Sequence, residues 1–154
     1  KIKNRSISAD AIITEKENFP IAVLTADCVP ILLFDENRKM IAAIHAGWKG
    51  AFKKIINKVV KFMLKKGCNT KNITVAIGPS ITQKSYNVKI GFKNKFIKKH
   101  KKNKIFFKNR NKLIYFDLPN YIKSQLKFNK ISKIDMINID TYDKKNNFLV
   151  LDVL

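Results

Sequence analysis

Short apolar runs rich in branched residues alternate with polar clusters along the first half of the chain, a pattern typical of buried strands. Residues 20–34, PIAVLTADCVPILLF, have a polar centre and predict two buried strand segments. DENRK at 35–39 predicts a turn, and MIAAIHA at 40–46 predicts a strand that pairs back as a hairpin. NITVAIG at 72–78 predicts a further strand.

The segment after the hairpin instead has the spacing of an amphipathic helix. Its apolar residues recur on one face and its lysines take the other, and Gly67 is expected to end the helix. We expect a second helix over 91–99 and a third from Pro119 to about Phe128. The lysine-rich stretch from Lys93 to Lys112 is interpreted as a helix end followed by a basic loop. Further strands are expected in KLIYFDL and KIDMINID, so the mixture predicts an α+β or mixed α/β layered domain.

Length and composition suit one globular domain over residues 1–154, since 45% of the residues are apolar. No apolar run is long enough for a membrane span, and no secretory leader is recognised, so we expect no membrane partner. Two cysteines are too few for a disulfide scaffold, which favours a reducing, cytoplasmic location. The sequence leaves the oligomeric state open.

The formal net charge is +21, and arginine occurs at only three positions, so nearly all of the 32 basic residues are lysine. Abundant Lys, Ile and Asn are typical of A/T-rich codon usage, which raises charge without selection for a partner. No Asp or Glu occurs between Asn37 and Phe116, and such a one-signed segment attracts phosphate-bearing ligands. The scarcity of arginine argues against a nucleic-acid partner.

Cys28 in TADC and His45 in HAGWKG are the first candidates for chemistry. If the two strands pair across the 35–39 turn, both residues come near the same end of the sheet. A thiolate beside an imidazole is either a pair of metal ligands or a nucleophile with its base. The alternative is a buried cysteine and a hydrogen-bonded histidine without a catalytic role.

The GWKG turn leads into the predicted helix and is the best candidate anion site. Gly47 and Gly50 would expose backbone N–H groups at the helix start, and Lys49 adds a cation. Alternatively, the glycines only form the turn. Trp48 would stack on an aromatic base or fill the edge of the core.

Several motifs together resemble one bacterial family. TADCVPILLFD, IAAIHAGWKGA, AIGPSI with SYNV, FDLPNYIKSQL and DTYD resemble the family first called polyphenol oxidases or laccase-domain proteins. ADAIIT at 9–14 is similar to its GDALVT segment. The resemblance runs from about Ala9 to Phe148. It implies α+β architecture, with mixed β-sheets packed face to face and helices outside, in α/β/β/α layers.

The same resemblance implies a function. The family is assigned zinc-dependent purine nucleoside phosphorylase activity, with adenosine deaminase and methylthioadenosine phosphorylase activity at the same site. By the matching motifs, two of the family's three zinc ligands correspond to Cys28 and His45 of this chain. The third, a histidine upstream of the GDALVT segment, has no counterpart here, and we expect the domain to be incomplete at both ends. His100 matches no motif and is expected to be an ordinary surface residue.

The chain also departs from the family pattern. Ser80, Thr82, Ser85 and Asn87 replace the usual residues around Tyr86, a candidate substrate contact, and the arginines after TYD are absent. Lys49 replaces the commoner arginine. The leading hypothesis is a zinc enzyme that takes purine nucleosides and phosphate. The alternatives are a catalytically impaired, truncated paralogue acting as a basic binding module, a copper-dependent phenol oxidase, and a cysteine hydrolase using Cys28 and His45.

Overall fold

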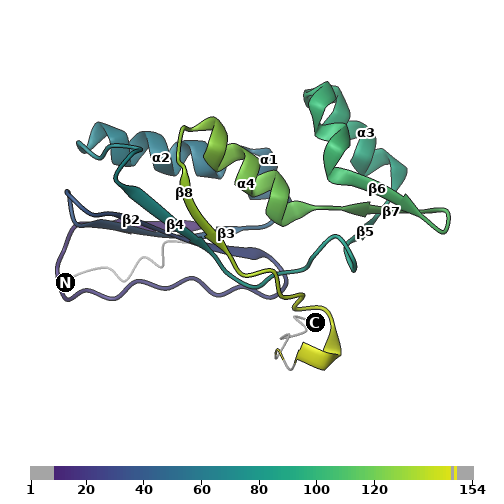
Figure 1. The fold of residues 1–154 in the computed structure, drawn as a ribbon, viewed down its shortest axis with the longest axis horizontal. Coiled ribbons are helices and arrows are strands. Elements are labelled where there is room, and N and C mark those ends of the chain that lie inside the picture. The colour runs from purple at the N-terminus through teal and green to yellow at the C-terminus, as the bar shows by residue number, and fades with distance from the viewer. Residues whose placement is uncertain (1–8, 147, 149–154) are drawn as a thin grey trace, which may run out of the picture.

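A five-stranded sheet forms the centre of the computed structural model, which describes residues 9–146 and 148 (Figure 1). Its strand order is β1-β3-β2-β4-β8. Neighbouring strands are antiparallel except β4 and β8, which are parallel. The five strands are β1 (Ala11–Thr14), β2 (Val29–Asp35), β3 (Met40–Ala46), β4 (Ile73–Ile77) and β8 (Lys133–Met136).

The predicted hairpin is confirmed. β2 and β3 pair antiparallel, from Asp35 opposite Met40 to Val29 opposite Ala46. Alternate residues of β2 are buried, whereas Leu32 and Phe34 between them are exposed. Because successive side chains of a strand point to opposite faces, one face of the sheet packs on the core and the other is open.

The first of the two strands predicted over residues 20–34 is wrong, because only Val29–Asp35 is a strand. The positions on either side of the hairpin are already filled. β1, which the apolar pattern did not predict, lies beside β3, and β4 lies beside β2. The segment before β2 therefore has no strand to pair with.

Helices cover one face of this sheet, as Figure 1 shows for α1 (Trp48–Phe52), α2 (Ile55–Lys65) and α4 (Leu118–Phe128). The single helix expected after the hairpin is two helices. The break falls at Lys54, which adopts the left-handed conformation with φ 62°. Gly67, with φ 89°, follows the end of α2, as predicted.

A second sheet of three strands, in the order β5-β7-β6, lies at one end of the molecule beside α3 (Ile90–Lys99) (Figure 1). Its strands are β5 (Asn87–Val88), β6 (Phe107–Arg110) and β7 (Leu113–Phe116). The predicted basic loop therefore contains structure, namely the 3₁₀ helix η1 (Lys101–Phe106) and β6. The cause is aromatic packing, since Phe96 and Phe116 are fully buried with ring centroids 4.9 Å apart.

The α+β class is confirmed by the two sheets and the helices outside them. The open face of the larger sheet exposes Leu32 to 53%. Over that face, the described residues place no second sheet of the kind that the family resemblance implies. A short 3₁₀ helix, η2 (Lys144–Asn146), lies near the C-terminal end. None of the described helices has the length and apolarity needed to cross a membrane.

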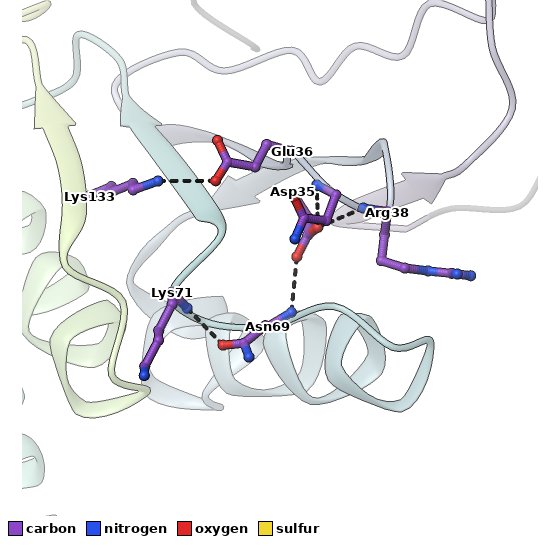
Figure 2. Close-up of polar contacts among 7 residues, drawn as sticks. Asp35, Glu36, Arg38, Asn69, Lys71 and Lys133 are labelled. Carbon is purple, nitrogen blue, oxygen red and sulfur yellow. Dashed lines mark hydrogen bonds and ion pairs between the residues drawn. The ribbon is translucent and has the colours of Figure 1, made fainter.

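Asp35 fixes the far end of the hairpin (Figure 2). Its side chain is fully buried and accepts hydrogen bonds from the backbone N–H groups of Asn37, Arg38 and Asn69, at 3.1, 2.8 and 3.0 Å. Burial alone would raise the pKa of this carboxyl, but these donors outweigh it and hold the pKa below its usual value. The β2–β3 turn and the loop before β4 are thereby joined through one charge.

Candidate functional site

The hairpin register brings Cys28 and His45 to one end of the sheet. His45 lies opposite Pro30, and Cys28 comes directly before Val29, which lies opposite Ala46. The sulfur of Cys28 lies 2.9 Å from the place that a Cβ on Gly47 would occupy. Gly47 therefore leaves room for the thiol beside the strand that carries His45. If Cys28 and His45 bind one zinc ion, we expect the sulfur and a ring nitrogen to lie roughly 3 to 4.5 Å apart, and this separation stays a prediction.

Asp10, the residue directly before the edge strand β1, contacts His45. Its Oδ1 lies 3.2 Å from His45 Nδ1, and its carbonyl accepts from the His45 backbone N–H at 2.8 Å. With the proton on Nδ1, the lone pair of Nε2 is available to a metal. The sequence motif ADAIIT contains Asp10 but does not predict this contact, because the contact depends on β1 pairing with β3.

The environment of Cys28 disfavours its thiolate in the absence of a metal. Burial raises the pKa of the thiol, and the carboxylates of Asp27 and Asp10 raise it further. A nucleophilic cysteine needs the opposite, a nearby cation that lowers the pKa. A divalent cation would itself deprotonate a coordinating thiol. Metal ligation is therefore better supported here than a cysteine–histidine dyad.

Tyr86 is near enough to Cys28 for the two side chains to interact electrostatically. Burial raises the pKa of its phenol to about 12, and the charge of the Cys28 thiolate contributes to the shift. Its ring packs edge-on against Phe116, with centroids 5.8 Å apart. Tyr86 therefore stays protonated at neutral pH and can donate a hydrogen bond beside Cys28.

The GWKG residues are placed differently from the sequence expectation. Gly47 caps α1, and Trp48, Lys49 and Gly50 lie within it instead of in a turn before a long helix. The helix has five residues, so its dipole is small, but its first N–H groups still lack intrahelical acceptors. Trp48 is half-buried and packs edge-on against Phe92, at 5.1 Å between ring centroids. This packing favours the core-edge reading of Trp48.

A polar network that the sequence patterns do not predict joins the loops on either side of this site. Asp140 is buried and accepts hydrogen bonds from the hydroxyls of Thr82, at 2.6 Å, and Ser85, at 2.8 Å. Thr141 donates to Asp27 at 2.7 Å. The network ties the loop before Tyr86, the TADC loop and the DTYD segment together. These motifs were visible in the sequence, but their contacts span more than fifty residues.

The remaining cysteine and histidine of the chain do not join this site. Cys68 is buried against Met40, with the two sulfur atoms 3.7 Å apart, and burial is the main reason that its pKa rises to about 11. His100 is exposed and accepts from the Lys102 backbone N–H, as expected of a surface residue.

The donor types at this site suit zinc, because a thiolate and an imidazole that is hydrogen-bonded to a carboxylate are preferred zinc ligands. In the part of the chain that the structure describes, no three His, Cys, Asp or Glu residues are grouped so that they could hold a metal. Cys28 and His45 would therefore fill two positions of a tetrahedral site.

The chain is similar in sequence to proteins whose names state an activity. The chain is 39% identical over 142 residues to purine nucleoside phosphorylase RP494 of Rickettsia prowazekii, covering 91% of this chain and 58% of the relative. It is 42% identical over 79 residues to adenosine deaminase RL5 from an unknown prokaryotic organism, covering 51% of this chain and 30% of the relative. The chain thus spans little more than half the length of the phosphorylase.

Solved structures agree with the fold. The crystal structure of the hypothetical protein YfiH from Bacillus licheniformis superposes with a TM-score of 0.80 at 25% identity, covering 87% of this chain and 52% of that one. The profile of the family described as multi-copper polyphenol oxidoreductase laccase matches residues 1–149. With this match added to the YfiH-type fold, the chain belongs to the multi-copper polyphenol oxidoreductase laccase family.

Proposed function

We propose that the chain contributes two ligands of a zinc site to a purine nucleoside phosphorylase, which also deaminates adenosine and phosphorolyses methylthioadenosine. The observation that carries the proposal is the convergence of Cys28, His45 and Asp10 at one end of the β1–β3–β2 sheet. The printed names of two relatives, a purine nucleoside phosphorylase and an adenosine deaminase, supply the substrate class.

Each residue has a role in this proposal. Cys28 and His45 hold the metal, and Asp10 orients the imidazole so that Nε2 is presented. Bound zinc would supply Lewis-acid chemistry, including an activated water for deamination. Tyr86 donates a hydrogen bond to the nucleoside from its protonated phenol. Trp48 would contact the base only at the exposed edge of its ring, since the rest packs on α3.

The phosphate co-substrate needs a separate anion site. The N–H groups at the start of α1, from Gly47 to Gly50, and the exposed Lys49 are the candidates nearest to Cys28. The lysine surplus of the chain adds an attractive field that raises the local phosphate concentration. We place the reaction in the cytoplasm, where free thiols and nucleosides coexist.

Metal analysis tests the proposal directly. The purified chain is titrated with Zn²⁺ and Cu²⁺, and rates are measured with inosine plus phosphate, with adenosine alone, and with methylthioadenosine plus phosphate. Cys28→Ser and His45→Ala should each abolish zinc binding, whereas the matched His100→Ala variant should bind as the parent does. Zinc binding that survives Cys28→Ser would overturn the metal site. A zinc-loaded chain that turns over none of the three nucleosides would overturn the activity of this chain while leaving its metal site intact.

A further inference from the structure

Three lysines lie over two aromatic rings where α1 meets α3, and we call them the α1–α3 lysine cluster: Lys49, Lys95 and Lys99. Lys95 Nζ lies 5.2 Å from the ring centroids of both Trp48 and Phe52. Lys49 Nζ lies 5.8 Å from the Trp48 ring, and Lys99 Nζ lies 3.8 Å from the Phe52 ring. Cation–π contacts of this kind hold flexible ammonium groups in place.

The cluster is close enough for its members to repel one another. Lys99 Nζ also donates to the Phe52 carbonyl, and its pKa is lowered first by burial and then by the charges of Lys54 and Lys95. Within residues 9–146 and 148, the side-chain ion pairs are His45 with Asp10 and Lys133 with Glu36, so no acid neutralises these lysines. The two helices belong to the segment without Asp or Glu. A bound polyanion would relieve the repulsion.

The shape of the surface narrows the ligand class. Four main cavities among the described residues have linings that contain no member of the cluster, so none of these four offers an enclosed small molecule a place beside it. A lipid bilayer would need an exposed apolar anchor beside the cations. The exposed large apolar side chains of the described residues include none from α1, where Trp48 and Phe52 are half-buried beneath the lysines. The exposed one on α3, Ile90, is nine residues before Lys99 and therefore lies on the opposite side of that helix. An open row of cations over aromatic rings suits an extended phosphate chain.

We propose that the α1–α3 lysine cluster binds the phosphate backbone of single-stranded nucleic acid, without sequence specificity. Composition alone argues against such a partner, because lysine is in surplus everywhere and arginine is scarce. The fold adds an arrangement that composition does not contain: three cations from two helices, ordered on aromatic rings and without acidic partners among the described residues. Lysine contacts the phosphate backbone as a point charge. The scarcity of arginine therefore removes recognition of particular bases but not affinity for the phosphates.

The test is a salt series with a fluorescein-labelled oligothymidylate of twenty nucleotides and the full chain. Log K should fall linearly with log salt, and Lys95→Gln/Lys99→Gln should flatten the slope by about 1.4, at about 0.7 per lost phosphate contact. The variant should also weaken binding at low salt on the order of tenfold. The single variant Lys95→Gln is the control for misfolding, since the exposed Lys95 side chain makes no hydrogen bond to the described residues. It should flatten the slope by about 0.7.

Lys61→Gln/Lys65→Gln on α2 is the matched control, with two exposed lysines at the same helical spacing and the same loss of charge. It should leave the slope within the error of the parent. An equal loss from both double variants would mean that net charge alone attracts the oligonucleotide, and would overturn the cluster as a site. Binding to vesicles of phosphatidylcholine with 30% phosphatidylglycerol, lost in the cluster variant while oligonucleotide binding persists, would assign the surface to a membrane instead.

Discussion

Single contacts decide whether the two proposed metal ligands can act together. Asp10 is the clearest case, because its carboxylate fixes the histidine ring through the 3.2 Å contact to Nδ1. Asp10→Asn keeps the shape but loses the charge that favours the Nδ1–H tautomer. We expect zinc affinity to fall about 10- to 100-fold, the usual cost of losing such a partner.

Isothermal titration or a competing zinc chelator measures this loss. Asp143→Asn, at an exposed site in the DTYD segment, serves as the control and should bind zinc like the parent. Unchanged affinity in Asp10→Asn would show that the ring is oriented by other contacts.

Gly47 is required at its position by space, not by backbone conformation, since its φ is −72°. An alanine Cβ would lie 2.9 Å from Cys28 Sγ, so the thiol must rotate away. Gly47→Ala should therefore lower zinc affinity about tenfold or more, while the free energy of unfolding changes by less than about 1 kcal/mol, because only a side-chain end moves.

Gly91→Ala is the matched substitution, because a Cβ there meets nothing within 4 Å. It lies in the first turn of α3 and should leave zinc binding unchanged. Equal zinc affinity in the Gly47 and Gly91 variants would contradict the placement of the thiol.

A substitution at Lys49 should affect the two proposed reactions to different extents. Lys49→Glu places a negative charge at the proposed phosphate site, so phosphorolysis of inosine should slow more than deamination of adenosine, which needs no phosphate. The reversal Lys98→Glu on α3 should change neither rate, since an exposed charge is screened within about 8 to 10 Å. Steady-state rates with each substrate measure the difference. An equal slowing of both reactions would assign Lys49 to the nucleoside or to structure.

At the scale of elements, one buried carboxylate joins the hairpin to the loop before β4. Asp35 accepts from three backbone N–H groups, which hold its pKa below the ordinary value. A lowered folded-state pKa means that this stabilisation is fully present above the unfolded pKa of about 3.9 and is lost as the pH falls through the folded value.

Asp35→Asn should lower the free energy of unfolding at pH 7 by about 1–3 kcal/mol, because one amide group then faces backbone donors that it cannot satisfy. Urea unfolding between pH 7 and pH 3 measures the effect, and the variant should lose less stability than the parent over the acid part of the range. Glu36→Gln removes the adjacent carboxylate, which is exposed and pairs with Lys133 at 3.3 Å. It should cost about 0–1 kcal/mol. Equal costs for the two variants would contradict the role of Asp35.

At the scale of the whole molecule, the formal charge of +21 opposes the compact state. Raising the salt concentration shortens the Debye length from about 30 Å at 0.01 M to about 8 Å at 0.15 M, which screens this repulsion. Tm should therefore rise by several degrees over that range at pH 7. Differential scanning calorimetry in sodium chloride measures the shift. A Tm that stays constant or falls would show that local ion pairs outweigh the net repulsion.

The sequence by itself determined the features that depend on local spacing. The hairpin followed from two apolar runs around a polar turn, and the amphipathic face of α2 followed from its helical period. The shared sheet end of Cys28 and His45 followed from the same register, because a hairpin turn fixes which residues lie opposite one another. Family membership could also be inferred from the motifs, and the profile match confirms it.

Tertiary structure decided what depends on distant partners. β1 is a strand because β3 offers it an edge, whereas residues 20–27 are not, because both sides of the hairpin are occupied. Asp10 reaches His45 across 35 residues, and Asp140 reaches Thr82 across 58, so no local pattern predicts either contact. The lysines of α1 and α3 become a cluster only when the two helices meet. Hydrophobic periodicity reports which face of an element is buried, but the partner of that face is chosen by the packing of the whole chain.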